Sequence, residues 1–152
     1  MKHYTFSHCD GEKTVPLDHK KDIVAAIAAA SAKPGPGAAT MIRGQILDKL
    51  KALGWSGEIK LASDSDMTVT STKSEIGLCL QTGNMSRMYA DLIKLQTMYL
   101  DNQIRGAAIL VPSQEAAKLL GSNIAQAKRL ERELAIFKKA YHVPTIIYAL
   151  EA

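Results

Sequence analysis

The sequence predicts an α/β fold in which helices flank one mixed central sheet. Segments with the helical spacing of apolar residues alternate with segments rich in β-branched residues, and one expected strand is apolar along its whole length. A strand of that kind is buried on both faces, so helices must cover both sides of its sheet. With 152 residues, of which 47% are hydrophobic, the chain is expected to form one domain over residues 1–152.

The first third of the chain predicts two helices separated by a loop. One helix is expected from Asp18, as its N-cap, to Ala32, and another from Ala38 to Leu53, with Gly54 at the C-cap position. Residues 33–37 read Lys-Pro-Gly-Pro-Gly and cannot continue a helix, since proline lacks the N–H group. They are expected to form an internal loop, and a short strand follows over Ile59–Ala62.

The middle of the chain changes from helical spacing to strand alternation. Two segments, Asp66–Thr70 and Glu75–Gln81, alternate polar and apolar side chains. With Ser71–Ser74 as the turn, the two segments pair antiparallel and Asp66 lies opposite Cys79. One face of this hairpin then gathers three polar side chains: Asp66, Cys79 and Gln81.

The second half of the chain predicts helices and strands in alternation. Helices are expected over Ser86–Leu100, over Gln114–Leu120 and from a cap at Ser122 or Asn123 to Tyr141, and strands over Ile104–Val111 and Pro144–Leu150. The strand that begins at Ile104 is the one that is apolar throughout. This order of elements gives a mixed sheet with helices on its faces.

Composition limits the cellular location and the binding partners that we expect for the chain. The apolar run Ile23–Ala32 is too short for a membrane span and no secretory leader precedes it, so a cytoplasmic location without a membrane partner is expected. Cys9 and Cys79 are expected to remain thiols. The net charge of +4 is compatible with binding a polyanion but does not require one.

Several segments along the chain carry a resemblance to a known family. They are the run Ile76–Asn84, a helix that contains Arg87, Tyr89, Asp91 and Lys94, the strand end Ile109–Pro112, Glu133 in a long helix, and Val143–Pro144. On these segments the chain resembles the restriction endonucleases of the BglII/BstYI type. The resemblance implies a restriction-endonuclease-like core, a homodimer that binds palindromic duplex DNA, and phosphodiester hydrolysis with Mg²⁺ or Mn²⁺.

The resemblance also implies where the catalytic residues lie. The superfamily places an Asp on one strand and a Glu-x-Lys motif on the next, and in this branch a Gln replaces the Lys. Gln81 matches that Gln, and Asp66 matches the Asp and becomes the expected metal ligand if the hairpin turn is longer than in the relatives. Otherwise Thr70, which carries no charge, takes its place. The Glu position holds Cys79, and a thiol is a poor ligand for Mg²⁺, which prefers hard oxygen donors.

The expected site is therefore short of negative charge. Metal-dependent cleavage of duplex DNA is expected to be weak or lost, because Cys79 occupies the position of a metal-binding Glu. Other acids that could substitute for the missing carboxylate are Glu75, Asp64 and Glu58. Whether cleavage survives depends on which of them reaches the site.

Two classes of function follow from these expectations. In the first, the chain binds duplex DNA, and the expected contacts to phosphates or bases are Lys73, Asn84 and Arg87, which lie near the expected site in sequence. In the second, it is a non-catalytic interaction or regulatory module, for example a dimer partner in a mobile-element or restriction-related system. That module would assemble through the apolar stripe of residues 86–100. DNA affinity at low salt discriminates the two classes.

Overall fold

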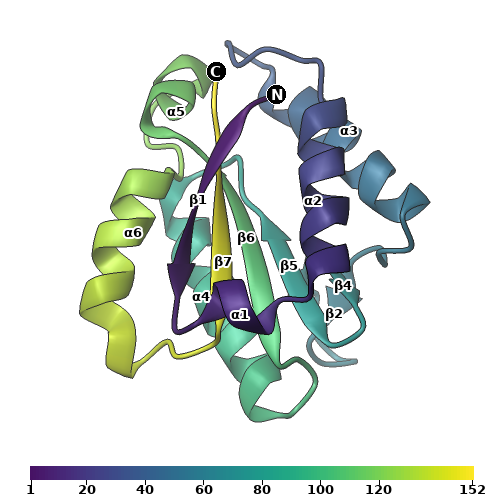
Figure 1. Cartoon of the computed structure of the whole chain (residues 1–152). Helices are drawn as coiled ribbons and strands as arrows, with labels where there is room; N and C mark the ends of the chain where they lie inside the picture. The colour runs from purple at the N-terminus through teal and green to yellow at the C-terminus, as the bar shows by residue number, and fades with distance from the viewer.

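A mixed sheet of five strands lies at the centre of the computed structural model, which describes residues 1–152 (Figure 1). Its strands are β1 His3–His8, β4 Ser71–Lys73, β5 Ile76–Leu80, β6 Gly106–Pro112 and β7 Thr145–Leu150, in the spatial order β1-β7-β6-β5-β4. The inner strands β5, β6 and β7 are parallel, whereas the edge strands β1 and β4 pair antiparallel with their neighbours. A separate two-stranded ribbon consists of β2 Ile59–Lys60 and β3 Thr68–Val69. The predicted mixed sheet is confirmed.

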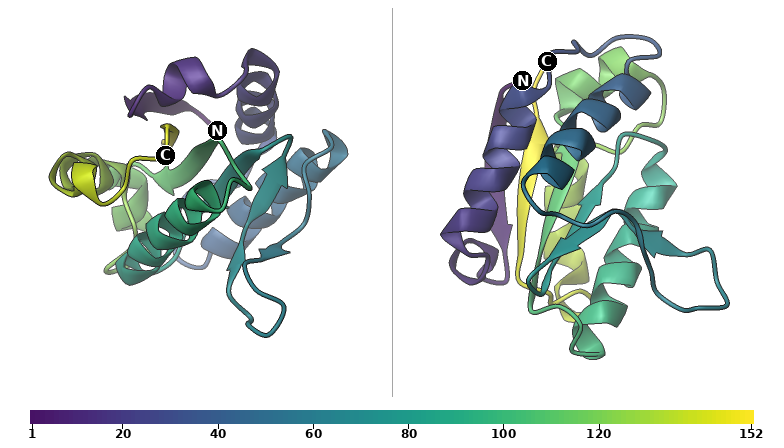
Figure 2. Two further views of the ribbon diagram at one scale, coloured as in Figure 1. Left: turned by 90° about the horizontal axis from the view of Figure 1, so that it is seen from below. Right: turned by 90° about the vertical axis from the view of Figure 1, so that its right-hand side faces the viewer.

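Helices cover both faces of this sheet. They are α1 Gly11–Thr14, α2 Leu17–Ala29, α3 Ala39–Ala52, α4 Met85–Leu100, α5 Gln114–Leu120, α6 Ala127–Ile136 and the 3-10 helix η1 Phe137–Lys139. α2 and α3 pack on one face and α4 and α6 on the other, and the right-hand view of Figure 2 shows α2 and α4 on opposite sides of the sheet. None of the helices combines the length and the apolar character that crossing a membrane requires.

The composition of β6 explains the three layers. Ala107, Ile109 and Val111 pack into the apolar cluster under α4 and α6, whereas Ala108 and Leu110 face the cluster under α2 and α3. Every residue of β6 is buried. The prediction of a strand that is covered on both faces is therefore confirmed.

Some predicted helix ends are wrong, and each has a local cause. Asp18 does not cap α2, because Pro16 is the N-cap and the helix begins at Leu17; it ends at Ala29 rather than at Ala32. α6 begins at Ala127 because the side chain of Gln126, which accepts a hydrogen bond from the Arg129 N–H at 3.2 Å, is its N-cap. Asn123, one of the expected caps, instead has left-handed backbone with φ 54°. Residues 33–37 form neither helix nor strand, as predicted.

The predicted hairpin is present with a different register. β4 pairs with β5 so that Ser71 lies opposite Leu78. The turn consists of Ser74 and Glu75, with φ angles of 44° and 64°, so most residues expected in the turn belong to a strand. The segment expected to pair with β5 was Asp66–Thr70. Its residues Thr68 and Val69 form β3, which pairs with β2 instead.

Candidate functional site

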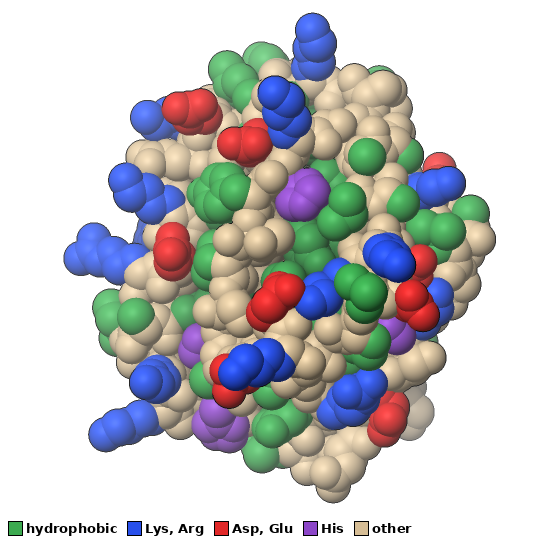
Figure 3. Space-filling model, viewed as in Figure 1, with side chains coloured by type: hydrophobic (Ala, Val, Ile, Leu, Met, Phe, Trp, Pro, Cys, Tyr) green, Lys and Arg blue, Asp and Glu red, His purple; other side chains and the backbone are tan.

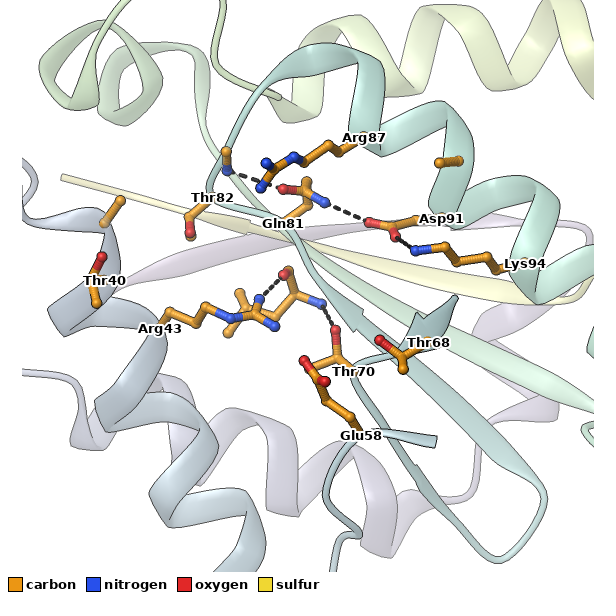
Figure 4. Close-up of a pocket in the computed structure, with 14 residues that line it drawn as sticks. Thr40, Arg43, Glu58, Thr68, Thr70, Gln81, Thr82, Arg87, Asp91 and Lys94 are labelled. Atoms are coloured by element: carbon orange, nitrogen blue, oxygen red, sulfur yellow. Dashed lines mark hydrogen bonds and ion pairs between the residues drawn. The ribbon is translucent and has the colours of Figure 1, made fainter. Parts of the chain in front are cut away.

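A polar cavity of about 540 Å³ lies at the carboxyl end of β5 (Figure 4). Its walls come from the start of α3, from the β2–β3 ribbon, and from the loop that leads from β5 into the first turns of α4. Its polar side chains are Thr40, Arg43, Glu58, Thr68, Thr70, Gln81, Thr82, Arg87, Asp91 and Lys94. Three of these side chains are cationic and two are carboxylates, so the cavity has a net positive charge.

Gln81 joins the β5 wall to the α4 wall. Its Nε2 donates a hydrogen bond to Asp91 Oδ2 at 2.9 Å, and its Oε1 accepts one from the backbone N–H of Gly83 at 3.1 Å. A Cβ at Gly83 would lie 3.1 Å from that Oε1, so a glycine allows the loop to close tightly around the amide. Both ends of the Gln81 amide are therefore engaged within the protein.

Asp91 and Lys94 form an ion pair on the α4 wall. Asp91 Oδ1 lies 3.6 Å from Lys94 Nζ, and the two side chains expose only 10% and 20% of their surface. Burial raises the pKa of Asp91, while the hydrogen bond from Gln81 and the charge of Lys94 act in the opposite direction. The charges of this pair compensate each other, so the net charge of the cavity depends on the remaining ionic side chains.

Two arginines enter the cavity without a carboxylate partner. Arg43, from α3, donates through Nη1 to the carbonyl oxygen of Leu80 at the end of β5. Arg87 extends from the first turn of α4 and is exposed. Neither guanidinium belongs to any of the ion pairs of the molecule. Their positive charge is therefore available to an anionic ligand.

Thr70 and Cys79 are neighbours at the position where the resemblance implies two carboxylates. Extending the β4–β5 register by one residue places Thr70 opposite Cys79, and Thr70 Oγ1 accepts a hydrogen bond from the Leu80 N–H at 3.1 Å. Cys79 has no exposed surface and packs into the core under α4. Burial, together with the nearby charge of Asp91, raises the pKa of the Cys79 thiol, so it is neutral at physiological pH. Both Cys79 and Cys9 are free, as predicted.

Asp66 does not take part in this site, and its expected pairing with Cys79 is wrong. The observed register differs from the expected one by four residues, which brings Thr70 to that position. Asp66 lies in the connection between β2 and β3, which projects from the body of the molecule in Figure 2. Its side chain is fully exposed and lies 3.7 Å from Lys60 Nζ. Of the expected catalytic set, only Gln81 lines the cavity.

Only some of the expected DNA contacts line the cavity. Arg87 lines the cavity, as predicted. Lys73 lies by the turn of the β4–β5 hairpin, where its Nζ is 2.6 Å from Asp22 Oδ2, so its expected place near the site is wrong. Asn84 follows Gly83 but caps α4, because its Oδ1 accepts a hydrogen bond from the Ser86 N–H at 2.9 Å. Among the substitute acids, Glu58 reaches the cavity, whereas Glu75 and Asp64 do not.

The side chains present do not fit Mg²⁺ or Mn²⁺ in the manner that the resemblance implies. Hard divalent cations bind through several oxygen ligands, of which carboxylates are the strongest. The three implied positions hold a hydroxyl, a protonated thiol and an amide, which we call the neutral trio: Thr70, Cys79 and Gln81. Asp91 is already paired with Lys94, Glu58 is the one other carboxylate of the cavity, and no group of three or more His, Cys, Asp or Glu side chains gathers anywhere in the chain. The donor set for a metal ion is therefore incomplete.

The cavity contains three charged residues to which the sequence alone assigned no role: Arg43, Asp91 and Lys94. Asp91 did carry a signal, because it lies between Met88 and Leu92 on the buried stripe of α4, where a charge needs a partner. Lys94 follows three residues later, at the spacing of a helical ion pair. Arg43 gives no such signal, because its role depends on how α3 packs beside β5.

Comparisons with known proteins agree with this fold. The crystal structure of restriction endonuclease BglII complexed with a DNA 16-mer matches with a TM-score of 0.81 at 14% identity, over 100% of this chain and 77% of that chain. The crystal structure of free BglII matches with a TM-score of 0.77 at 14% identity, over 99% of this chain and 79% of that chain. At these identities the likeness shows the fold alone, and a comparison with curated protein sequences finds no match. The family described as restriction endonuclease BamHI matches residues 20–151, and the chain therefore belongs to this restriction endonuclease family.

Proposed function

We propose that this chain is a restriction-endonuclease-like protein that binds duplex DNA and whose metal-dependent cleavage of DNA is weak or lost. Family membership and the BglII-like fold support nuclease-like DNA binding, and one of the matching structures is a complex with DNA. The neutral trio is the observation that carries the loss of cleavage: Thr70, Cys79 and Gln81. No carboxylate stands where the resemblance implies two.

The chemistry of the site separates binding from cleavage. Phosphodiester hydrolysis of this kind needs a firmly held divalent ion, and a site without paired anionic oxygens does not retain one. DNA binding needs only positive charge at the phosphates. Arg43 and Arg87 supply that charge without a competing carboxylate partner. The proposed activity is thus binding with slow or absent hydrolysis.

Plasmid cleavage and DNA-binding assays test the proposal together. Incubation of supercoiled plasmid with Mg²⁺ or Mn²⁺ should leave it uncut or nicked only slowly, while duplex DNA should be retarded in gels at low salt. Affinity should fall steeply as salt rises, with a slope of about −0.9 per phosphate contact. Asp66→Ala should change neither readout, because Asp66 lies outside the cavity. Efficient linearisation of the plasmid would contradict the loss of cleavage, and absence of retardation would contradict DNA binding.

A second candidate function is a non-catalytic interaction module that assembles as a homodimer. An apolar groove of about 450 Å³ lies between α4 and η1, and its apolar lining is formed by Tyr89, Leu92, Ile93, Phe137, Ala140 and Tyr141. Ile93 and Phe137 expose 68% and 39% of their surface at this groove. Much of the α4 stripe expected to serve assembly, including Met88 and Leu95, is instead buried in the core of the monomer. The groove is therefore the part of α4 that could bind a second copy.

Sedimentation velocity at micromolar concentration tests this assembly. The wild-type chain is expected to sediment as a dimer, and Ile93→Glu as a monomer, because a charge at an apolar contact cannot be buried without a partner. Leu119→Glu on α5 is the matched control, since Leu119 is also an exposed apolar side chain, at 49%, but lies outside the groove. A wild-type monomer rules out this candidate, and a dimer that tolerates Ile93→Glu rules out the groove as its interface.

A further inference from the structure

We propose that the cavity binds a backbone phosphate of DNA directly through Arg43 and Arg87, with no divalent cation between the protein and the phosphate. This inference rests on the proposed DNA-binding function and specifies its chemistry. In the position where relatives are expected to hold a metal ion, cationic side chains of the protein supply the positive charge. The ligand class is a phosphodiester, recognised by its charge and its oxygens rather than by its bases.

The first support is the balance of charge in the cavity. Lys94 lies 3.6 Å from Asp91, and Glu58 is the only other carboxylate that lines the cavity. Arg43 and Arg87 make no ion pair with either acid. A cavity that gathers cations beyond what its own anions neutralise favours an anionic ligand.

The second support is the way Arg43 is held. Its Nη1 donates to the carbonyl oxygen of Leu80, so the side chain from α3 is fixed against the end of β5. Figure 4 shows Arg43 and Arg87 on opposite sides of Gln81, one from the α3 wall and one from the α4 wall. A guanidinium has five N–H donors in a planar fork that matches two phosphate oxygens. One bond to Leu80 leaves most of those donors of Arg43 free for a ligand.

The third support concerns the start of α4, which is not free to bind the phosphate by itself. The Met85 N–H donates to Asn123 O at 2.9 Å, the Ser86 N–H to Asn84 Oδ1 at 2.9 Å, and the Arg87 N–H to Asn84 O at 3.0 Å. The first three backbone donors of this helix are thus occupied. Binding of an anion here depends on side chains, which substitutions can remove one at a time.

The fourth support is that the neutral trio is a poor site for a divalent cation. Arg43 and Lys94 line the cavity together with Gln81, and Asp91, the carboxylate that acts on the Cys79 thiol, is paired with Lys94. A divalent ion at the neutral trio would therefore meet cationic neighbours and, besides the paired Asp91, a single carboxylate, Glu58, which is too few for a hard divalent cation. The same cationic side chains attract a phosphate. The affinity for DNA should then be independent of divalent ions beyond their contribution to ionic strength.

Fluorescence anisotropy with a short labelled duplex tests the inference. Affinity of the wild-type chain is measured in EDTA and in Ca²⁺ at matched ionic strength, and it should not rise when Ca²⁺ is present. Arg43→Gln and Arg87→Gln should each weaken binding about tenfold and make the salt slope less steep by about one phosphate contact. Arg132→Gln, which removes the same charge from the exposed face of α6, should reduce binding far less. Lys and Arg side chains project along the edge of the molecule that α6 forms (Figure 3), so this variant controls for general positive charge.

The outcomes separate the inference from the function on which it rests. A wild-type chain that does not bind the duplex overturns both. Binding that Arg43→Gln and Arg87→Gln reduce no more than Arg132→Gln does leaves DNA binding intact and overturns the phosphate site. A tenfold gain in affinity with Ca²⁺ overturns the claim that no cation intervenes. Arg43→Lys, which keeps the charge, should restore part of the lost affinity, and the exposed Arg87 carries the test if Arg43→Gln does not fold.

Discussion

Asp91 is a buried carboxylate whose polar partners all belong to the cavity. Gln81 donates to one of its oxygens at 2.9 Å, and Lys94 lies 3.6 Å from the other. Burial outweighs both partners and raises the pKa of Asp91. A carboxyl group whose pKa is higher in the folded than in the unfolded chain makes folding less favourable once it ionises. At neutral pH, Asp91 therefore lowers stability, while its charge limits the positive charge of the cavity.

Asp91→Asn is expected to raise the free energy of unfolding at neutral pH by about 0.5–2 kcal/mol, the usual gain from a stabilising substitution. The gain should shrink as the pH falls, because folded wild-type Asp91 takes up its proton first, and it should vanish below about 3.9, the pKa of an unfolded Asp, where the unfolded chain is protonated as well. Urea denaturation over a series of pH values measures this difference. Asp48→Asn, at an exposed position of α3, should stay within about 0.5 kcal/mol of the wild type. A gain that is equal at every pH would show that ionisation of Asp91 is not its cause.

At the scale of elements, the sequence predicts the long periodic segments well. α3 and α4 lie within one residue of their predicted bounds, because their apolar spacing repeats over enough residues to fix both type and position. The shorter α5 and β7 do so too, because Ser113, Gly121 and Pro144 mark their ends. β1 was not predicted. It is an edge strand in which Tyr4 and Phe6 alternate with polar residues over only a few positions, and its pairing with β7 joins opposite ends of the chain, with Tyr4 opposite Ala149. Local pattern carries no information about such a pairing.

The hairpin explains why only part of the site could be predicted. The alternation over Asp66–Thr70 identifies strand-like residues but not their partner, and Val69 pairs with Ile59 of β2 rather than with β5. The true turn, Ser74 and Glu75, has left-handed backbone at both residues without the Asn or Gly that would have indicated it. Gln81 could be placed because it lies directly after β5, whereas the neighbour of Cys79 depended on the register.

At the scale of the whole molecule, the cavity exists because helices from opposite faces of the sheet meet at the end of one strand. α3 belongs to the layer on one side and α4 to the layer on the other, and their N-terminal turns enclose the end of β5. Arg43 and Asp91 therefore come together only when all three layers have formed. Because Thr70 and Cys79 are neutral, they add no buried negative charge beside Asp91. The fold can then be stable without a bound cation.

Combining Thr70→Asp with Cys79→Glu tests this dependence on the stability of the entire fold. In EDTA, the double variant should lose at least about 3 kcal/mol of unfolding free energy, because unpaired carboxylates are added beside Asp91, one of them at a buried position. Mg²⁺ at about a hundred times its dissociation constant should restore about 2.7 kcal/mol, whereas K⁺ at equal ionic strength should not. Thermal or urea denaturation measures both changes, and Thr70→Asp alone, at a half-buried position, serves if the double variant does not fold. The wild-type chain should unfold identically in EDTA and Mg²⁺. Stabilisation of the wild type by Mg²⁺ would mean that its own side chains hold the ion, and a folded double variant that gains nothing would mean that these positions do not form the cation site.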